Sequence, residues 1–77
     1  SDPAQELEAK ELGKIIINWL EQLPEASRLV FVRRYWYGDS MEELSRTFGL
    51  PKALLSQRLS RMRGRLKAYL EQQGVGL

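Results

Sequence analysis

The residues with the clearest chemistry are the cations between positions 52 and 67. From Lys52 to Leu77 the chain holds six lysines and arginines and one acid, Glu71, which gives this part a charge of +5. Such a density of cations binds phosphates, because the release of counterions from a nucleic-acid backbone favours association. A helix surface that is merely solvated usually has acids between its cations, in i,i+4 pairs, and this one does not. These residues therefore predict a DNA-binding helix.

The rest of the chain is charged differently. Residues 1–25 hold six acids and two lysines, a charge of −4, and residues 26–51 hold four arginines and three acids, a charge of +1. The total of +2 therefore hides a strong separation of charge between the two ends. We expect DNA to avoid the acidic end and to approach the basic one.

The spacing of apolar residues predicts one helix over about 52–72. Leu55, Leu59, Met62 and Leu66 follow one another at helical intervals and form a stripe that we expect to be buried. Small and polar residues occupy the first two turns, where a recognition helix meets base edges, and cations follow where it passes phosphates. The predicted DNA-binding residues are Lys52, Ala53, Ser56, Gln57, Arg58, Ser60, Arg61 and Arg63.

A short helix over 41–48 and a sharp turn precede this helix. Ser40 and Glu43 have the spacing of a capping box, which begins a helix. Gly49 suits the left-handed conformation that ends one, and Pro51 suits the first turn of the next. Leu50 between them is an apolar residue that we expect to pack in the turn. Together these signals predict a helix-turn-helix, the motif that inserts its second helix into the major groove.

The N-terminal half predicts two further helices, over about 3–22 and 24–36. Asp2 and Pro3 form a helix start, and a helical stripe of apolar residues extends to Leu23. Arg33 and Arg34 either extend the basic surface or pair with an acid at position 42 or 43. The aromatic run 35–37 is either a stacking platform for bases or, as we expect, part of the core at a helix junction, with one ring as a possible protein contact.

The fold class expected is therefore all-α: a single four-helix domain over residues 1–77, containing a helix-turn-helix without winged elements. The helices are predicted at about 3–22, 24–36, 41–48 and 52–72, and a tail over 73–77 is expected to fray. The sequence does not begin with methionine, and we expect the domain to come from a longer protein.

The composition argues against catalysis. The chain has no histidine and no cysteine, which removes the commonest bases, nucleophiles and thiolate metal ligands. No phosphate-cradling glycine motif is present, and no apolar run approaches the length of a membrane span. We expect no enzyme activity, cofactor, metal, small-molecule substrate or membrane partner, and a cytoplasmic location.

An ordered set of motifs extends over residues 19–70. They are Leu23-Pro24-Glu25, Val30-Phe31, Arg34-Tyr35, Gly38-x-Ser40, Glu43-Leu44, Gly49-Leu50-Pro51, Arg58-Leu59-x-Arg61-x-Arg63 and Leu66. In this set the chain resembles region 4 of a bacterial sigma factor, most closely the extracytoplasmic-function type. This resemblance implies binding to the promoter −35 element and docking on the flap of the RNA polymerase β subunit, with an anti-sigma factor as a further candidate partner.

The resemblance also implies roles for individual residues. Lys52, Ser56 and Gln57 match positions that face −35 bases or adjacent phosphates, and Arg61 matches a basic position further along the helix. Arg58 matches a recurrent arginine that contacts a phosphate or forms an ion pair within the domain. The sequence departs from the family's usual residues at positions 54, 56 and 64, which are leucine, serine and glycine here.

Two other functions stay open at this point. One is an adaptor that resembles region 4 but binds polymerase or a regulator without contacting bases, which the departures at 54 and 64 allow. The other is the output domain of a LuxR-type response regulator, which has a similar helix-turn-helix. That class needs another helix after the recognition helix for dimerisation, and we predict none here.

Overall fold

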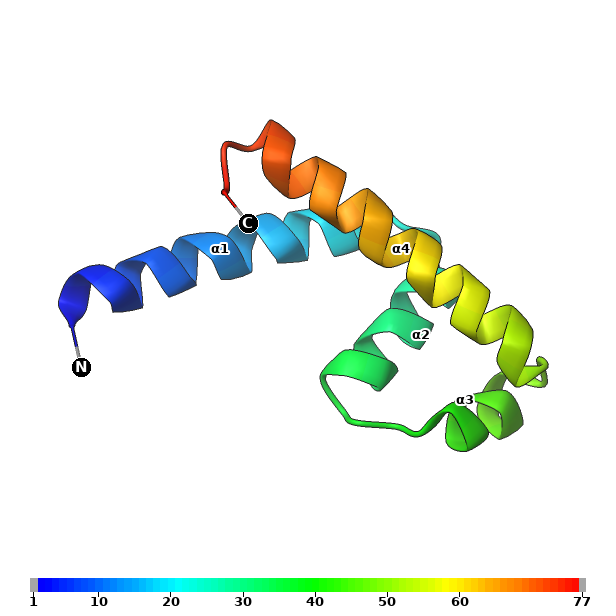
Figure 1. Ribbon diagram of the computed structural model, residues 1–77. Coiled ribbons are helices and arrows are strands. Elements are labelled where there is room, and N and C mark those ends of the chain that lie inside the picture. Colours follow the sequence, from blue (N-terminus) through cyan, green and yellow to red (C-terminus); the bar gives the residue numbers. More distant parts are fainter. Residues whose placement is uncertain (1, 77) are drawn as a thin grey trace.

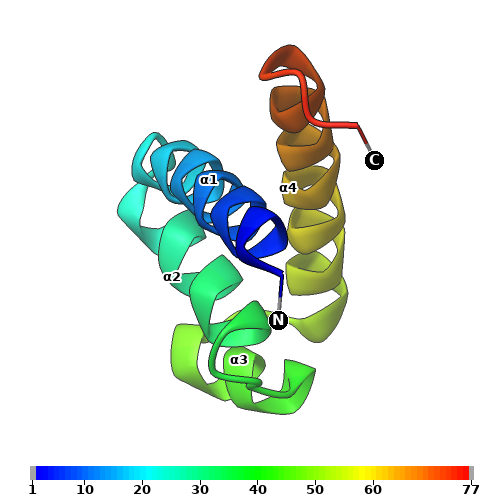
Figure 2. The same cartoon turned by 90° about the vertical axis from the view of Figure 1, so that its left-hand side faces the viewer.

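The chain forms four helices in the computed structural model, which describes residues 2–76. They are α1 (Pro3–Glu21), α2 (Glu25–Tyr35), α3 (Met41–Phe48) and α4 (Lys52–Gln72) (Figure 1). The described residues include no strand, which confirms the all-α fold class with its helix-turn-helix. α1 and α4 lie alongside each other, while α2 and α3 pack below them (Figure 2).

Local hydrogen bonds cap α1 and α3 at residues that the sequence indicated. The Asp2 carboxylate accepts from the Ala4 amide at 2.9 Å, with proline at the first helical position. The capping box at α3 is complete: the Glu43 amide donates to the Ser40 hydroxyl at 3.0 Å, and the Ser40 amide donates to the Glu43 carboxylate at 2.9 Å. Gly49 ends α3 with φ 64°, a conformation that a Cβ would disfavour.

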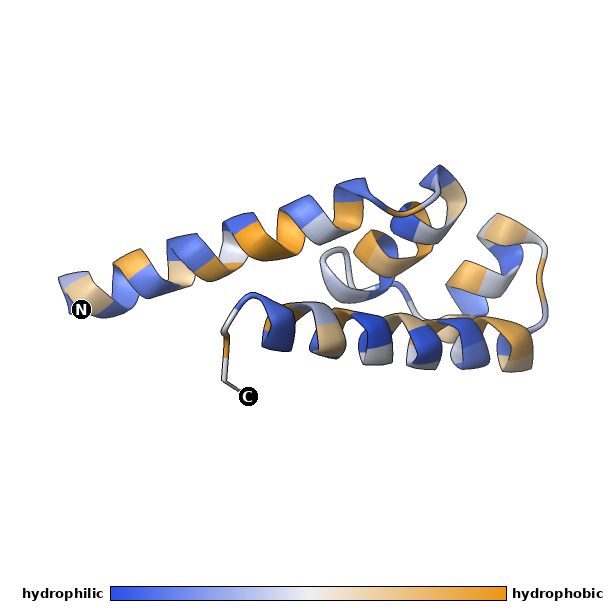
Figure 3. Ribbon diagram, turned by 90° about the horizontal axis from the view of Figure 1, so that it is seen from above, coloured by the Kyte–Doolittle hydropathy of each residue, from blue (hydrophilic) through white to orange (hydrophobic). Residues whose placement is uncertain are grey.

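The core lies where the stripe of α4 meets the other three helices. Leu44 of α3 and Leu55 of α4 are fully buried, and the Trp19 and Phe31 rings pack edge to face with centroids 5.3 Å apart. The stripe predicted on α4 is confirmed, because Leu55, Leu59, Met62 and Leu70 are buried and Leu66 packs against them. Hydrophilic residues follow the outer side of α4, as Figure 3 shows.

The first half of α1 projects beyond this core. Residues 2–11 are all exposed, and the buried residues of α1 are Trp19 and Leu20 near its other end. Figure 1 shows the N-terminal turns extending away from α2 and α3. The compact part of the domain therefore begins about halfway along α1.

The end of α4 differs from the frayed tail that was expected. Gly74 has φ 80°, its amide donates to the Glu71 carbonyl at 3.1 Å, and the Val75 amide donates to the Leu70 carbonyl at 2.9 Å. This pair of bonds is a Schellman motif, which satisfies the last helical carbonyls. Residues 73–75 thus follow an ordered turn in the structure, and residue 77 lies outside the described part of the chain.

The aromatic run after α2 is exposed, which corrects its predicted place in the core. Tyr35, Trp36 and Tyr37 are 44%, 61% and 73% exposed. The chain turns after Tyr35, and Gly38 has φ 73°, so the segment follows the outer surface.

Asp39 holds this turn, and it is the partner of the two arginines whose role was open. Its carboxylate accepts from Arg33 Nε at 2.7 Å, and its carbonyl accepts from Arg34 Nη1 at 2.8 Å. Asp39 itself is buried, so these bonds compensate a carboxylate held away from water.

No helix within residues 2–76 combines the length and apolar character required to cross a bilayer.

Candidate nucleic-acid interface

The turn between α3 and α4 fixes the angle between the two helices. The Ser45 hydroxyl donates to the Leu50 carbonyl at 2.6 Å, and the Ser45 carbonyl accepts from the amides of Gly49 and Leu50 at 2.9 and 3.3 Å. Leu50 is half-buried against the core, and Pro51 then caps α4 in an extended conformation. Side chain, backbone and apolar packing thus hold the second helix of the motif in one orientation.

Six of the eight predicted DNA-binding residues share one face of α4. At about 100° per residue they span roughly half of the helix circumference, from Lys52 at one edge to Arg61 at the other. All six are exposed, and none is covered by another element of the described chain. These residues, called here the recognition face, are Lys52, Ala53, Ser56, Gln57, Ser60 and Arg61.

Lys52 at the edge of the recognition face pairs with an acid of α3. Its Nζ lies 3.2 Å from Glu42 Oε1, and both side chains are more than half exposed. The pKa of Glu42 is lowered, first by a hydrogen bond from its own backbone amide and then by Lys52. Exposed pairs of this kind are weak, so Lys52 can exchange the carboxylate for a phosphate.

Arg63 lies on the flank of α4 that faces the end of α2. Its Nη1 donates to the Tyr35 hydroxyl at 2.6 Å, and the Tyr35 ring packs on Phe31 with centroids 4.7 Å apart. Arg63 is therefore anchored, through Tyr35, to the core, although its position seven residues after Ser56 puts it on the same side of α4 as that residue.

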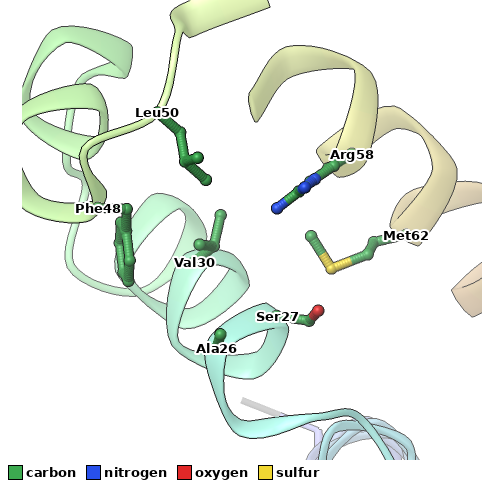
Figure 4. Close-up of a pocket in the computed structure, with 7 residues that line it drawn as sticks. All are labelled: Ala26, Ser27, Val30, Phe48, Leu50, Arg58 and Met62. Carbon is green, nitrogen blue, oxygen red and sulfur yellow. The ribbon is translucent and has the colours of Figure 1, made fainter. Parts of the chain in front are cut away.

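Arg58 lies on the opposite flank. It extends from α4 toward a cavity of about 160 Å³ between α2, α4 and the turn, where it lies near Leu50 and Met62 (Figure 4). No carboxylate within residues 2–76 pairs with it, so the structure gives no support to the ion pair that was one of its two expected roles.

Ser27 and Arg65, which lie beside Arg58, were not among the residues predicted from the sequence. Arg58, Arg61 and Arg65 line a hollow of about 210 Å³ together with Met62 of α4 and Ser27 of α2. The spacing of the three arginines, 3 and 4, was a signal that they share one side of α4. Nothing in the sequence indicated that Ser27 would face them, because that contact depends on how α2 packs. The hollow is suited to an anion and is continuous with the recognition face through Arg61.

The arrangement fits recognition of a duplex better than any catalytic role. Small and polar side chains at the start of α4 allow close approach to base edges, and the cations beside and beyond them suit phosphates. Within the described residues no cluster of three or more acids could hold a metal ion.

The family model of sigma-70, region 4, matches residues 19–68. The match extends from the end of α1 through the helix-turn-helix and most of α4, so it includes the whole recognition face. No curated protein gave a significant match, and neither did any solved structure. Region 4 is a DNA-binding domain of transcription factors that act with RNA polymerase, and it is not an enzyme family. The match covers more than half of the sequence, and the chain therefore belongs to the sigma-70 region 4 family.

Proposed function

We propose that this domain binds the −35 element of a promoter through the recognition face and docks on the β flap of RNA polymerase. The observation that carries the first part is the exposure of all six residues of that face on a helix whose opposite stripe is buried. Membership of the sigma-70 region 4 family supports promoter DNA as the target. Sequence-specific DNA binding as part of a sigma factor accounts for both the exposed recognition face and the family match.

The proposal assigns different tasks to residues along α4. Ser56 and Gln57, in its second turn, contact base edges, since amide and hydroxyl groups can both donate and accept there. Ala53 and Ser60 are small and allow the helix to approach the groove closely. The cations Lys52, Arg58, Arg61 and Arg63 contact phosphates on either side of the groove.

Docking on the flap is proposed for a second surface, which contains no residue of α3 or α4. Ile17 and Leu20 of α1, Val32 of α2 and Trp36 line an apolar depression of about 230 Å³. Ile17 and Trp36 are more than half exposed. An aromatic anchor beside exposed aliphatic residues is typical of protein interfaces. Because the two surfaces use different elements, the domain can hold DNA and polymerase together.

The same proposal places the domain in the bacterial cytoplasm, where polymerase meets promoters. It also makes an anti-sigma factor a candidate competitor, since a protein that covers either surface would prevent initiation.

A salt titration tests DNA binding directly. The logarithm of the association constant for promoter DNA is expected to fall with the logarithm of salt concentration, with a slope near −0.9 for each phosphate contacted. Arg61→Ala removes one such cation and should reduce the slope by about 0.9 on every sequence. Lys10→Ala removes an exposed cation from the projecting part of α1 and serves as the matched control.

Two outcomes would contradict the proposal. A slope close to zero for the unaltered domain would favour the adaptor that binds protein alone. Equal loss of slope in Lys10→Ala and Arg61→Ala would mean that total charge, rather than the recognition face, determines binding.

A further inference from the structure

The projecting half of α1 and the turn after α4 enclose a groove that the proposed function does not use. Its volume is about 500 Å³. Three apolar residues of α1 and Val75 from the Schellman turn form most of its lining, and two acids of α1 complete it. The lining side chains are Leu7, Leu12, Ile15 and Val75 with Glu8 and Glu11.

This groove lies outside the part of the chain that matches the family. The match covers residues 19–68, whereas the lining comes from residues 7–15 and 74–75. DNA recognition and flap docking, as proposed above, involve residues 17–63. The groove is thus a separate surface, and its function need not be shared with other region 4 domains.

The apolar residues of the groove are incompletely covered within the described chain, since Leu12, Ile15 and Val75 are only half-buried. Leu7 is 59% exposed, and every residue of α1 up to Glu11 is exposed. Two or three helical turns without tertiary packing are marginal in water, because helix formation on its own is close to neutral. A molecule seated against Leu7, Leu12 and Ile15 would bury this surface and stabilise the projecting turns.

The charges along the groove specify the occupant. Glu8 and Glu11 lie beside the apolar residues, and the only nearby cation that pairs with them in the described structure is Lys14, 4.0 Å from Glu11, in a highly exposed pair. An anionic membrane surface would be repelled by these acids. The basic helix of a second copy does not fit either, since the apolar stripe of α4 is already buried in its own core.

We propose that the groove binds an amphipathic helix of a partner protein, one with an apolar ridge flanked by lysine or arginine. The ridge packs against Leu7, Leu12 and Ile15, and the flanking cations pair with Glu8 and Glu11. Complementary charges fix the orientation of such a helix and exclude acidic ones. The projecting half of α1 then acts as an arm through which a regulator reaches a promoter-bound domain.

The probe for this proposal is a synthetic helical peptide of about four turns, with leucines at i, i+3, i+4 and i+7 and lysines beside them. Its control is the same peptide with glutamate in place of lysine. Binding is measured by the fluorescence anisotropy of the labelled peptide, and amide chemical shifts of the 15N-labelled domain locate the binding site. We expect the lysine peptide to bind at least about tenfold more tightly, with shifts at residues 7–15 and 74–75.

Matched variants separate this groove from the other surfaces. Leu7→Ser and the pair Glu8→Gln with Glu11→Gln should each weaken binding of the lysine peptide several-fold. Leu29→Ser changes an exposed aliphatic residue of α2 that belongs to none of the proposed surfaces, and Glu21→Gln changes an exposed acid outside the groove. Both should leave peptide binding unchanged.

The result that would overturn the proposal is distinct from failure of the proposed function. Equal binding of both peptides, unchanged binding by the groove variants, or shifts confined to other surfaces would each refute it. All of these variants should keep the salt dependence of promoter binding, so loss of DNA binding and loss of peptide binding are measured independently. Circular dichroism of each variant confirms that α1 has kept its helix.

Discussion

α1 and α4 are similar in length, 19 and 21 residues, yet they differ in packing and in charge. α4 buries residues from its first turn to its last, at Leu55, Leu59, Met62 and Leu70. α1 buries only Trp19 and Leu20, near its C-terminal end. The exposed part of α1 is rich in acids, and that of α4 is rich in arginine and lysine.

The difference explains how one small domain can present two kinds of surface. A helix that packs along its whole length holds its outer side chains in fixed positions, as contact with base edges requires. A helix that packs at one end leaves its other end free for a partner whose binding completes the packing. The two proposals therefore assign rigid recognition to α4 and adaptable attachment of a partner to α1.

The largest expected effect is a loss of folding stability, and it should differ between a buried leucine of α4 and an exposed leucine of α1. Leu59→Ala should lower the free energy of unfolding by roughly 2–5 kcal/mol, because it leaves a cavity in the core. Leu7→Ala should change it by less than about 0.5 kcal/mol. Urea denaturation followed by circular dichroism measures both. Similar losses in the two variants would mean that α1 is packed along its length, and would remove the contrast.

The next effect concerns specificity. Gln57→Ala should weaken binding to the preferred −35 sequence by roughly 1–3 kcal/mol and reduce the preference for it over altered sequences. Gln72→Ala, near the exposed end of the same helix, is the matched control and should change neither. Competition binding with duplexes substituted at single positions gives both values. A uniform loss on all sequences would show that Gln57 contacts the backbone rather than bases.

The N-terminal caps of α3 and α1 should also differ in how much they contribute to folding stability. Ser40→Ala removes the capping box of α3, at the edge of the core, and should cost about 1 kcal/mol of stability. Asp2→Ala removes the cap of α1 at its projecting end, where the first turns can unwind without disturbing the core. Its effect on the unfolding midpoint should be clearly smaller. Equal shifts in thermal midpoint would show that unwinding at the two ends is coupled.

The smallest effect is a dependence on pH. The Ser40 amide and hydroxyl lower the pKa of Glu43, and the amide of Glu42 with Lys52 lowers that of Glu42. An acid whose pKa is lower in the folded protein stabilises it above its unfolded pKa, near 4.5 here, and this contribution is lost as pH falls through the folded value.

Glu43→Gln should therefore reduce the loss of stability between pH 6 and about pH 3, since glutamine can still accept the Ser40 amide bond and does not titrate over this range. Denaturation midpoints measured at several pH values test this. An identical pH dependence in both proteins would mean that the capping box contributes nothing to acid sensitivity.

The sequence predicted the helix-turn-helix because its determinants are local. Ser40, Gly49 and Pro51 act through their own backbone and near neighbours, so their types and spacing were enough to place the ends of α3 and the start of α4. The same holds for the stripe of α4, which depends only on helical periodicity. The assignment of base and phosphate contacts along α4 stays a prediction.

The errors and omissions involve contacts between distant parts of the chain. The ring of Tyr35 was expected in the core, but α2 ends there and the aromatic run turns onto the surface. Arg63 bonds to Tyr35 across 28 positions, and Ser27 meets three arginines only because α2 packs on α4. Periodicity identifies a helix face, but it does not identify what the face meets. Gly74 lies in the tail that was expected to fray, and glycine at that position is also what a Schellman motif requires.

Under the proposed function, the bond from the Ser45 hydroxyl to the Leu50 carbonyl has a consequence for the kinetics of promoter search. This bond holds the turn between α3 and α4 before DNA binds. The two helices would therefore approach a duplex as one rigid unit and lose little conformational entropy on contact. Encounters then need no folding step, and a domain of this kind can sample many sites briefly before it stops at one.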